Sequence, residues 1–367
     1  MKLTITRESL LTPLQIIAGV VEKKQTMPVL ANILLVADEN GLSLTGTNME
    51  VELVSRIENV EIEEPGRITV PAKKLSDICR ALDDQCRIQL VLKENRLHLS
   101  SGRSQFTLST LPAEHYPNIE EDAAGLELSV SQGELKNILD ATAFAMAQQD
   151  VRYYLNGMLF EVAPDFLRVV ATDGHRLAMA TIKMPTSVSE IRQVIVPRKG
   201  VQELTRLLSD TEAPCVLKIG DSHIRASVNN FVYTSKLIEG KFPDYQRVIP
   251  RGGNMVMMAD RQELRGTLLR AAILSHENVR GVRLQFDHNQ LKVFANNPEH
   301  EEAEDSLMVE YQAEPLQIGY NVRYQTDVLA AIDSATVKMT LANPNSSALI
   351  ESTESDTALY VVMPMRL

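Results

Sequence analysis

The chain repeats itself about every 125 residues, and this internal repeat constrains its fold more than any other feature of the sequence. The stretch ITVPAKKLSDICRAL at 68–82 returns as VIVPRKGVQELTRLL at 194–208, which is 126 residues further on. SQFTLSTLPAEHYP at 104–117 returns at the same offset as NFVYTSKLIEGKFP at 230–243. A fainter third copy of the stretch at 68–82 follows at 318–332. Matches in constant order indicate one supersecondary unit used several times. We therefore predict three similar domains, at residues 1–125, 126–252 and 253–367.

Each repeat combines two helical segments with many short strands. Apolar residues recur at three- and four-residue spacing in six predicted helices, at 7–24, 71–82, 133–147, 197–208, 260–275 and 321–333. Pro71 and Pro197 suit the first turn of the second helix in their repeats. The remaining segments alternate with period two, as in GLSLTGTNMEVELVSRI, and are separated by turn signals. The expected class is α+β, with two helices and antiparallel sheets in each domain.

Composition limits the setting in which such a chain works. Its 367 residues are 44% hydrophobic and 23% charged, which is typical of folded globular domains. Its apolar runs are shorter than a membrane helix needs, and the first residues lack the apolar stretch of a signal peptide. Cys79, Cys86 and Cys215 are too scattered for a disulfide framework. We therefore expect a cytoplasmic protein with reduced thiols.

Charge is divided unevenly between the predicted helices and the rest of the chain. The formal net charge is −11, yet the six helices hold 14 basic and 10 acidic residues, so everything outside them carries −15. A positive helical face suits sequence-independent contact with phosphates, although Lys and Arg on surface helices are often only solvated charge. The basic residues of this predicted face are Lys23, Lys24, Lys73, Arg80, Arg198, Lys199, Arg206 and Arg265.

Enzyme motifs are absent or weak. The sequence contains no GxxxxGK[ST] phosphate loop, no dinucleotide-binding glycine motif and no GxSxG nucleophile turn. Its cysteines and histidines lack metal-ligand spacing, so we expect no metal and no cofactor. The string Thr172-Asp173-Gly174-His175-Arg176 places a hydroxyl, a carboxylate and an imidazole together, but no partner that orients them is visible. A hydrolase that uses Asp173 and His175 is therefore a minor alternative.

Five strings of this sequence resemble the bacterial sliding clamp family, the beta subunits of DNA polymerase III. They are VRYYLNGMLFE at 151–161, ATDGHRLA at 171–178, VIVPRKG at 194–200, TSKLIEGKFPDY at 234–245 and YVVMPMRL at 360–367. The resemblance covers the whole chain, including its threefold repeat. It implies a non-catalytic processivity factor: a ring-shaped homodimer of six domains around double-stranded DNA, with helices lining the hole. It also implies that DNA polymerases, a clamp loader and other clamp-binding proteins dock through short peptide motifs.

Domain size agrees with a ring made from two chains. A domain of about 120 residues has a radius of gyration near 13–14 Å and is about 35 Å across. Three such domains in a circle leave essentially no hole, whereas six leave a hole of roughly 30 Å, which admits a DNA duplex. An alternative from another class is a three-domain peptide-binding adaptor that does not encircle DNA. The charge split between helices and the rest favours the ring.

The resemblance assigns a pocket for partner peptides to the second and third domains. An apolar cleft with methionines suits several partners, because thioether side chains repack readily. The last five residues are expected to lie beside the ATDGHRLA turn as a wall of this pocket, with Pro364 ending the strand pairing. The assigned residues are Leu155, Thr172, Gly174, His175, Arg176, Leu177, Pro243, Arg247, Val248, Asn321, Tyr324, Ser347, Val361, Val362, Met363, Pro364, Met365 and Arg366.

DNA contacts and the subunit interface are assigned in the same way. The DNA contacts are Lys24, Gln149, Tyr153 and Tyr154, and the positive helical face adds Lys73, Arg198 and Lys199. Lys24 stands where arginine is common in the family, which keeps the charge but loses the bidentate fork. The interface would place Phe106 and Leu108 against Ile273 and Leu274, with Lys74, Arg96 and Arg103 opposite Glu299, Glu301, Glu302 and Glu304. Gln105 stands where a basic residue is common in the family, and its uncharged side chain cannot form the ion pair of a basic residue.

Overall fold

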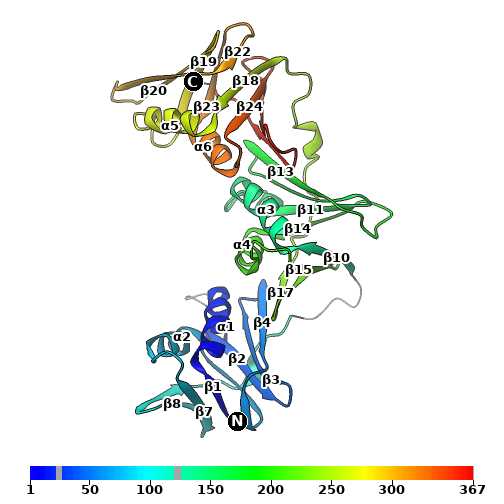
Figure 1. Ribbon diagram of the computed structural model, residues 1–367, viewed down its shortest axis with the longest axis vertical. Coiled ribbons are helices and arrows are strands. Elements are labelled where there is room, and N and C mark those ends of the chain that lie inside the picture. Colours follow the sequence, from blue (N-terminus) through cyan, green and yellow to red (C-terminus); the bar gives the residue numbers. More distant parts are fainter. Residues whose placement is uncertain (22–26, 120–124, 367) are drawn as a thin grey trace. The chain divides into compact units, whose positions relative to one another are not determined.

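The computed structural model describes residues 1–21, 27–119 and 125–366 of the chain. In that part of the chain, six α-helices accompany four antiparallel sheets (Figure 1). The helices are α1 Arg7–Val20, α2 Ala72–Ala81, α3 Gln132–Thr142, α4 Arg198–Leu207, α5 Arg261–Ala272 and α6 Val322–Ala331. They come in pairs along the chain, two to each sequence repeat, so the predicted α+β class is confirmed.

Two sheets lie mainly in the first half of the chain. The five-stranded sheet has the order β5-β1-β7-β8-β9. Its strands are β1 Lys2–Thr6, β5 Glu61–Glu64, β7 Arg87–Lys93, β8 Arg96–Ser101 and β9 Ser104–Ser109. The eight-stranded sheet has the order β10-β15-β16-β17-β4-β3-β2-β6. Its strands are β2 Asn32–Asp38, β3 Gly41–Thr47, β4 Val51–Ile57, β6 Gly66–Pro71, β10 Leu126–Ser131, β15 Pro214–Ile219, β16 His223–Val228 and β17 Phe231–Lys236.

The other two sheets lie mainly in the second half. The nine-stranded sheet has the order β14-β11-β12-β13-β26-β25-β24-β18-β22, and the four-stranded sheet has the order β21-β20-β19-β23. The nine strands are β11 Gly157–Ala163, β12 Phe166–Thr172, β13 Arg176–Lys183, β14 Arg192–Pro197, β18 Met255–Asp260, β22 Glu310–Tyr311, β24 Thr336–Leu341, β25 Ala348–Ser352 and β26 Ala358–Val362. The four are β19 Gly281–Asp287, β20 Gln290–Asn296, β21 Glu302–Met308 and β23 Leu316–Asn321. Short 3-10 helices are η1 Pro28–Ala31, η2 Ala113–His115, η3 Ala143–Ala145, η4 Tyr153–Leu155 and η5 Tyr245–Arg247.

Strand pairing crosses the boundaries between the sequence repeats. β17 of the second repeat pairs with β4 of the first, and β26 of the third pairs with β13 of the second. For this reason the chain divides into two compact units, Met1–Gly133 with Gln202–Leu237 and Glu134–Val201 with Ile238–Leu367. The two units cut through the second repeat, because each of the two large sheets contains strands from two repeats. The three domain boundaries drawn from the repeat stay a prediction.

Several helix ends differ from the predicted ones. Pro71 and Pro197 are the last residues of β6 and β14, and the helices begin one residue later, so their placement in the first helical turn was wrong. The third helix ends at Thr142, whose hydroxyl donates to the Ile138 carbonyl at 2.7 Å, and the chain continues as η3. Such a local side-chain bond occupies a carbonyl at the helix end. The first helix ends at Val20.

Helix α1 is seated directly on the sheet that it covers. Its residues Leu10, Leu14 and Ile17 are buried, and the helix contacts strands β3 and β4 as well as α2 (Figure 1). At Gly46 of β3, a Cβ would come within 2.5 Å of the Ile17 Cγ2 atom, so only glycine allows this approach. In the other unit, α5 makes the corresponding contacts with α6, β20 and β21. None of the helices in the described ranges is long and apolar enough to cross a bilayer.

We expect the native protein to expose one reactive thiol. Cys79 and Cys215 are buried, and burial raises the pKa of each thiol to about 12, whereas Cys86 is only half-buried. Because the thiolate is the reactive form, Ellman's reagent near neutral pH should modify Cys86 quickly and the other two only on unfolding. Cys86→Ser should abolish the fast phase, and a fast phase that survives in this variant would contradict the assignment.

Candidate functional site

The predicted pocket residues all lie in one compact unit, around the strands that join the second and third repeats. β13 and β26 run antiparallel, with Arg176 opposite Val362 and Leu177 opposite Val361. Beyond the last pair, the Met363 N–H donates to the carbonyl of His175 at 2.9 Å. The end of the chain is thereby fixed to the turn that precedes β13.

The final residues leave the sheet and cross to a second one. β26 ends at Val362, and Pro364 has no N–H to continue its ladder. The Met365 N–H then donates to the Gly319 carbonyl of β23 at 2.9 Å. Met363 and Met365 are both half-buried in this path, so their thioether side chains form part of the surface beside the turn.

The turn between β12 and β13 is tied by its own side chains. The Asp173 carboxylate accepts the N–H groups of His175 at 2.9 Å and Arg176 at 3.1 Å. The Thr172 hydroxyl donates to the Arg176 carbonyl at 2.6 Å. Gly174 has a φ of +88°, which favours glycine, and a Cβ there would lie 3.0 Å from the Arg152 guanidinium. These contacts fix the direction in which His175 leaves the turn.

An apolar cluster forms the floor of the site. Leu177 is 2% exposed and Val361 is fully buried, so both belong to the core as well as to the predicted pocket. Leu155 is also buried. The cluster consists of Leu159, Val170, Leu177, Ile195, Phe242, Tyr245 and Val361, with Tyr154, Met179, Ile238, Ile249, Leu349 and Leu359 packed against it.

Two of the hollows in this unit are lined in part by predicted pocket residues. The first, which we call the Arg247 hollow, has a volume of about 700 Å³ and shares Ile249 with the apolar cluster. It is lined by Asp244, Gln246, Arg247, Val248, Ile249, Pro250, Arg251, Ala342, Ser346 and Ser347. The second, the Arg198 hollow, has a volume of about 480 Å³. It is lined by Phe144, Met146, Ala147, Gln148, Asp150, Asp173, His175, Arg176, Arg198, Arg323, Tyr324 and Asp327.

Segment η5, which carries Arg247 at the edge of the Arg247 hollow, is anchored by a buried polar contact. The hydroxyl of Tyr245 donates to the Glu161 carboxylate at 2.7 Å. Arg168 donates to the same hydroxyl at 3.0 Å and lies 3.4 Å from the Glu161 carboxylate. Gln193 also donates to Glu161, so this buried carboxylate has three partners. The backbone that leads to Arg247 and Val248 is therefore held against the sheet.

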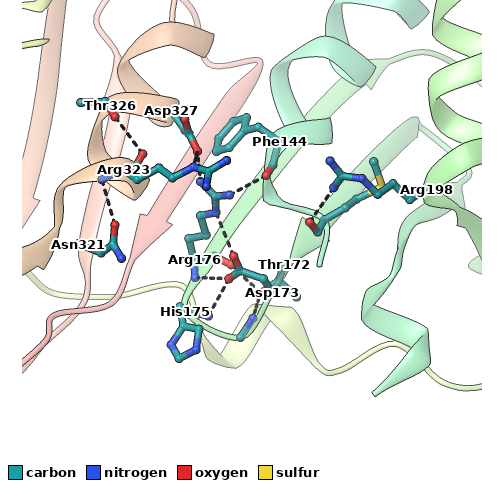
Figure 2. A network of polar contacts seen from close by, with 12 residues as sticks. Phe144, Thr172, Asp173, His175, Arg176, Arg198, Asn321, Arg323, Thr326 and Asp327 are labelled. Carbon is teal, nitrogen blue, oxygen red and sulfur yellow. Dashed lines mark hydrogen bonds and ion pairs between the residues drawn. The ribbon is translucent and has the colours of Figure 1, made fainter. Parts of the chain in front are cut away.

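Arg176 lies at the centre of the polar contacts in Figure 2. Its Nε donates to Asp173 at 3.1 Å, its Nη1 to Asp327 at 2.6 Å and its Nη2 to the Phe144 carbonyl at 2.8 Å. The side chain is only 9% exposed. A guanidinium that is buried to this degree needs such partners, because burying an unpaired charge is costly.

Two predicted pocket residues form an aromatic wall beside Arg176. The Arg176 guanidinium lies 4.6 Å from the centroid of the Tyr324 ring. The Tyr324 ring stacks on His175 with centroids 6.2 Å apart and an interplanar angle of 16°. Asn321 caps helix α6, which carries Tyr324, by accepting the Arg323 N–H at 3.0 Å. His175 and Tyr324 therefore meet from two different repeats.

The predicted DNA contacts near the site differ in exposure. Gln149 and Tyr153 are exposed, but Tyr154 is half-buried against the apolar cluster. In the same loop Arg152 donates from its backbone and its guanidinium to Asp150, and these bonds lower the pKa of Asp150 to about 2. Asp150 is therefore ionised at all physiological pH values, and the ion pair stabilises the loop.

Arg198 departs from the prediction of a freely exposed cation. Its guanidinium is half-buried and donates to the Met146 carbonyl at 2.9 Å (Figure 2). Burial, and then the positive charge of Arg176, lower the pKa of this guanidinium. Lys73 is exposed on α2 and Lys199 is half-buried on α4. Lys23 and Lys24 lie outside the described residues.

The predicted subunit-interface residues lie at sheet edges. β9, with Phe106 and Leu108, is the outer strand of the five-stranded sheet, and β21, with Glu302 and Glu304, is the outer strand of the four-stranded sheet. Ile273, directly after α5, is 77% exposed. Exposed charges in the two repeats that carry these edges are Lys74, Arg96 and Arg103 in the first and Glu299, Glu301, Glu302 and Glu304 in the third.

The side chains of the turn at 172–176 are not arranged as in the active site of a hydrolase. The Asp173 carboxylate is engaged by two backbone N–H groups and by Arg176. The His175 ring stacks on Tyr324. Within the described residues, no hydrogen bond joins this ring to Asp173 or to the Thr172 hydroxyl, as a base that activates a nucleophile would require. The turn is built to hold a surface rather than to transfer a proton.

Sequence reasoning missed two partners of Arg176. The Phe144 carbonyl is a backbone group, which no residue pattern reveals. The sequence does give a weak indication of Asp327, because an acidic residue stands at the same place in the second helix of each repeat. The acids are Asp77 in α2, Glu203 in α4 and Asp327 in α6.

Comparisons with known proteins agree with this fold. Three family models match in succession: the DNA polymerase III beta subunit N-terminal domain at residues 1–120, its central domain at 129–244 and its C-terminal domain at 246–366. The beta sliding clamp of Pseudomonas aeruginosa is 53% identical over 367 residues, which is the full length of both chains.

Several similar solved structures carry ligands, and two of them bear on the site. The crystal structure of the Pseudomonas aeruginosa sliding clamp bound to griselimycin is 53% identical, covers all of both chains and has a TM-score of 0.96. The Caulobacter crescentus beta sliding clamp has polyethylene glycol bound to its putative beta-motif tethering region. It is 36% identical, with a TM-score of 0.94, and the match covers 100% of this chain and 99% of that one.

The chain has three clamp-type domains in succession, and its site lies where the second and third repeats share a sheet. This combination is typical of the class of sliding clamps. The chain belongs to the DNA polymerase III beta subunit family, as the resemblance implied. It is thus a processivity factor, a non-catalytic subunit of the polymerase, and the hydrolase alternative is wrong.

Proposed function

We propose that two copies of this chain close into a ring around duplex DNA and tether DNA enzymes through the pocket described above. The observation that carries the proposal is a pair of sheet edges with opposite charge. β9 in the first repeat and β21 in the third are both edge strands, and each presents unpaired backbone groups. The first edge is flanked by Arg96 of β8 and by Arg103 in the turn before β9, and Lys74 lies on α2 of the same repeat. Four glutamates lie on β21 or just before it at the second edge.

Pairing between β9 of one copy and β21 of the next joins two chains head to tail. A contact between different surfaces closes into a ring when the rotation allows it, and two copies make the smallest ring. In the described part of the chain, no carboxylate lies within ion-pair distance of Lys74, Arg96 or Arg103. Glutamates from a second copy would supply these partners. The adaptor alternative, in which no ring surrounds DNA, does not explain why the two sheet edges carry opposite charges.

The pocket is the proposed docking site for polymerases, the clamp loader and other clamp-binding proteins. The Caulobacter crescentus relative holds polyethylene glycol in its putative tethering region, and we infer that the same region of this chain accepts a short peptide. Its buried leucines and its two C-terminal methionines offer an adaptable apolar surface. Griselimycin, found on the Pseudomonas aeruginosa clamp, is a ready probe for it.

A topological experiment separates the ring from the adaptor. The protein is loaded on nicked circular DNA with a clamp loader and ATP and then isolated by gel filtration. A ring stays on the circle and is lost when a restriction enzyme linearises the DNA, because it slides off the ends. An adaptor that binds DNA only as an open chain would show no such difference between circle and line, and this result would refute the ring. Because a clamp must reach chromosomal DNA, we also propose a cytoplasmic location, which the three free thiols fit.

Direct DNA binding without a loader is expected to be weak and steeply salt-dependent. Lys73→Glu should lower the affinity and reduce the slope of log K against log salt by about 1, since one phosphate contact is lost. Lys183→Glu is the matched control, because Lys183 is an exposed lysine on strand β13 rather than on a helix. Fluorescence anisotropy with a labelled duplex over a salt series measures the affinity and the salt slope of both variants. Binding that does not change with salt would contradict the phosphate-contact mechanism.

A further inference from the structure

We infer that Asp327, a residue of α6 outside the predicted pocket, positions the His175–Tyr324 wall of that pocket by holding Arg176. The inference rests on the proposed peptide-binding function and adds a positioning residue to it. Asp327 is 31% exposed in its side chain and meets Arg176 across the boundary between the second and third repeats. Figure 2 shows Arg176 reaching between the turn and the helix that carries Asp327.

The Arg176 guanidinium has three acceptors, and Asp327 is the one that comes from the third repeat. The other two, Asp173 and the Phe144 carbonyl, both belong to the second repeat. The Asp327 contact is also the shortest of the three, at 2.6 Å. A short, charge-assisted bond between a buried guanidinium and a carboxylate is strong and directional. It therefore fixes α6 relative to the turn.

Fixing α6 also fixes the aromatic wall. Tyr324 and Asp327 are three residues apart on α6 and therefore lie on one face of the helix. The same Arg176 guanidinium that binds Asp327 lies over the Tyr324 ring at 4.6 Å, an arrangement in which cation and ring attract each other. His175 precedes Arg176 in the turn and stacks on that ring. The ion pair thus sets the separation of two pocket side chains through Arg176, and Asp327 acts on them from outside the assigned set of pocket residues.

The junction between the first and second repeats shows that the fold does not need this ion pair. There Val51 stands opposite Ser235, as Arg176 stands opposite Val362. The Lys236 N–H donates to the Glu50 carbonyl at 2.8 Å, as Met363 does to His175. The Thr47 hydroxyl donates to the Val51 carbonyl at 2.9 Å, as Thr172 does to Arg176.

At that first junction the strand pair and the turn are therefore the same, but the arginine is replaced by Val51. The acid of the corresponding helix, Glu203, pairs with Arg206 of its own helix at 2.8 Å. Among the described residues, a shared sheet is thus built at this junction with valine in place of the arginine. The Arg176–Asp327 pair is an addition at the junction that carries the predicted pocket, which favours a role in binding over a role in folding.

The surroundings make Arg176 sensitive to the loss of Asp327. Arg323, the other cation near Asp327, lies 3.9 Å from it and is largely exposed, so it is a weak competitor. Without the Asp327 charge, Arg176 keeps one carboxylate, that of Asp173. It also keeps Arg198 as a like-charged neighbour. We expect the guanidinium to shift toward Asp173 and the Tyr324 ring to lose its fixed place.

The test is calorimetric titration of the full-length protein with griselimycin. Asp327→Asn keeps the shape and removes the charge, and its affinity should fall roughly threefold to tenfold, while the melting temperature changes little. Asp77→Asn is the matched control, because Asp77 holds the same place on α2 and pairs with Arg80 of its own helix. Asp327→Glu retains the charge and should restore at least part of the affinity.

A double-mutant cycle shows whether Asp327 acts through Arg176. In an Arg176→Gln background, Asp327→Asn should have no further effect on affinity. The place of the Tyr324 ring can be followed by fluorine NMR of protein labelled with fluorotyrosine, with the Tyr324 resonance assigned from the Tyr324→Phe variant. This resonance should shift in Asp327→Asn and keep its position in Asp77→Asn. Unchanged affinity in Asp327→Asn, or an equal loss in both backgrounds, would overturn the inference. Failure of the unmodified protein to bind griselimycin would instead overturn the proposed pocket itself.

Discussion

Replacing Ile273 and Leu274 by alanine is expected to convert a dimer of this chain into monomers. Ile273 is 77% exposed directly after α5, and Leu274 beside it is half-buried. A large apolar side chain exposed next to a charged sheet edge is typical of a surface that a partner covers. If both side chains are buried in the ring, each truncation costs about 2–5 kcal/mol, and each ring contains two such contacts.

Sedimentation velocity at micromolar concentration measures the result. The matched control is Ile191→Ala, since Ile191 is also a strongly exposed isoleucine, at 60%, but lies in the segment before β14. This control should stay dimeric. A double variant that sediments as a dimer would move the interface away from α5, and an unmodified protein that is monomeric would remove the ring altogether.

The sequence predicted the helices and strands better than it predicted which strands pair. The helix pairs and the period-two strands follow from local spacing, which periodicity records directly. The pairing of β4 with β17 and of β13 with β26 joins strands of different repeats, and its register depends on contacts distant in sequence. Spacing alone therefore indicated three repeated domains, but not the sheets that continue from one repeat into the next.

The site shows the same division between local and distant information. The turn at 172–176 was visible because Thr, Asp and Gly at this spacing make local side-chain bonds and a left-handed glycine. Asp327, by contrast, lies 151 residues from the arginine that it holds. The half-buried state of Arg198 depends on the Met146 carbonyl, which is equally invisible in a sequence. Residue type revealed which groups carry charge, but not which of them are already paired.

Deleting residues 363–367 is expected to abolish binding of partner peptides while leaving the protein folded and dimeric. The ladder between β13 and β26 ends with Arg176 opposite Val362, so the deletion removes no pair of that ladder. It does remove the Met363 N–H bond to His175 and the Met365 N–H bond to Gly319. The melting temperature should therefore change little, because the apolar cluster under the site stays complete.

The loss in affinity has a definite origin, since the two half-buried methionines form a surface beside the His175 turn. A milder variant, Met363→Ala, should cost on the order of 1–2 kcal/mol of binding free energy if its side chain anchors the ligand. Calorimetry with griselimycin measures both variants. The control is Glu354→Ala, which truncates an exposed side chain shortly before β26 and outside the assigned pocket. Unchanged affinity in the deletion variant would place the partner site elsewhere on the protein, whereas lost affinity with an intact melting transition would assign the end of the chain to the pocket wall.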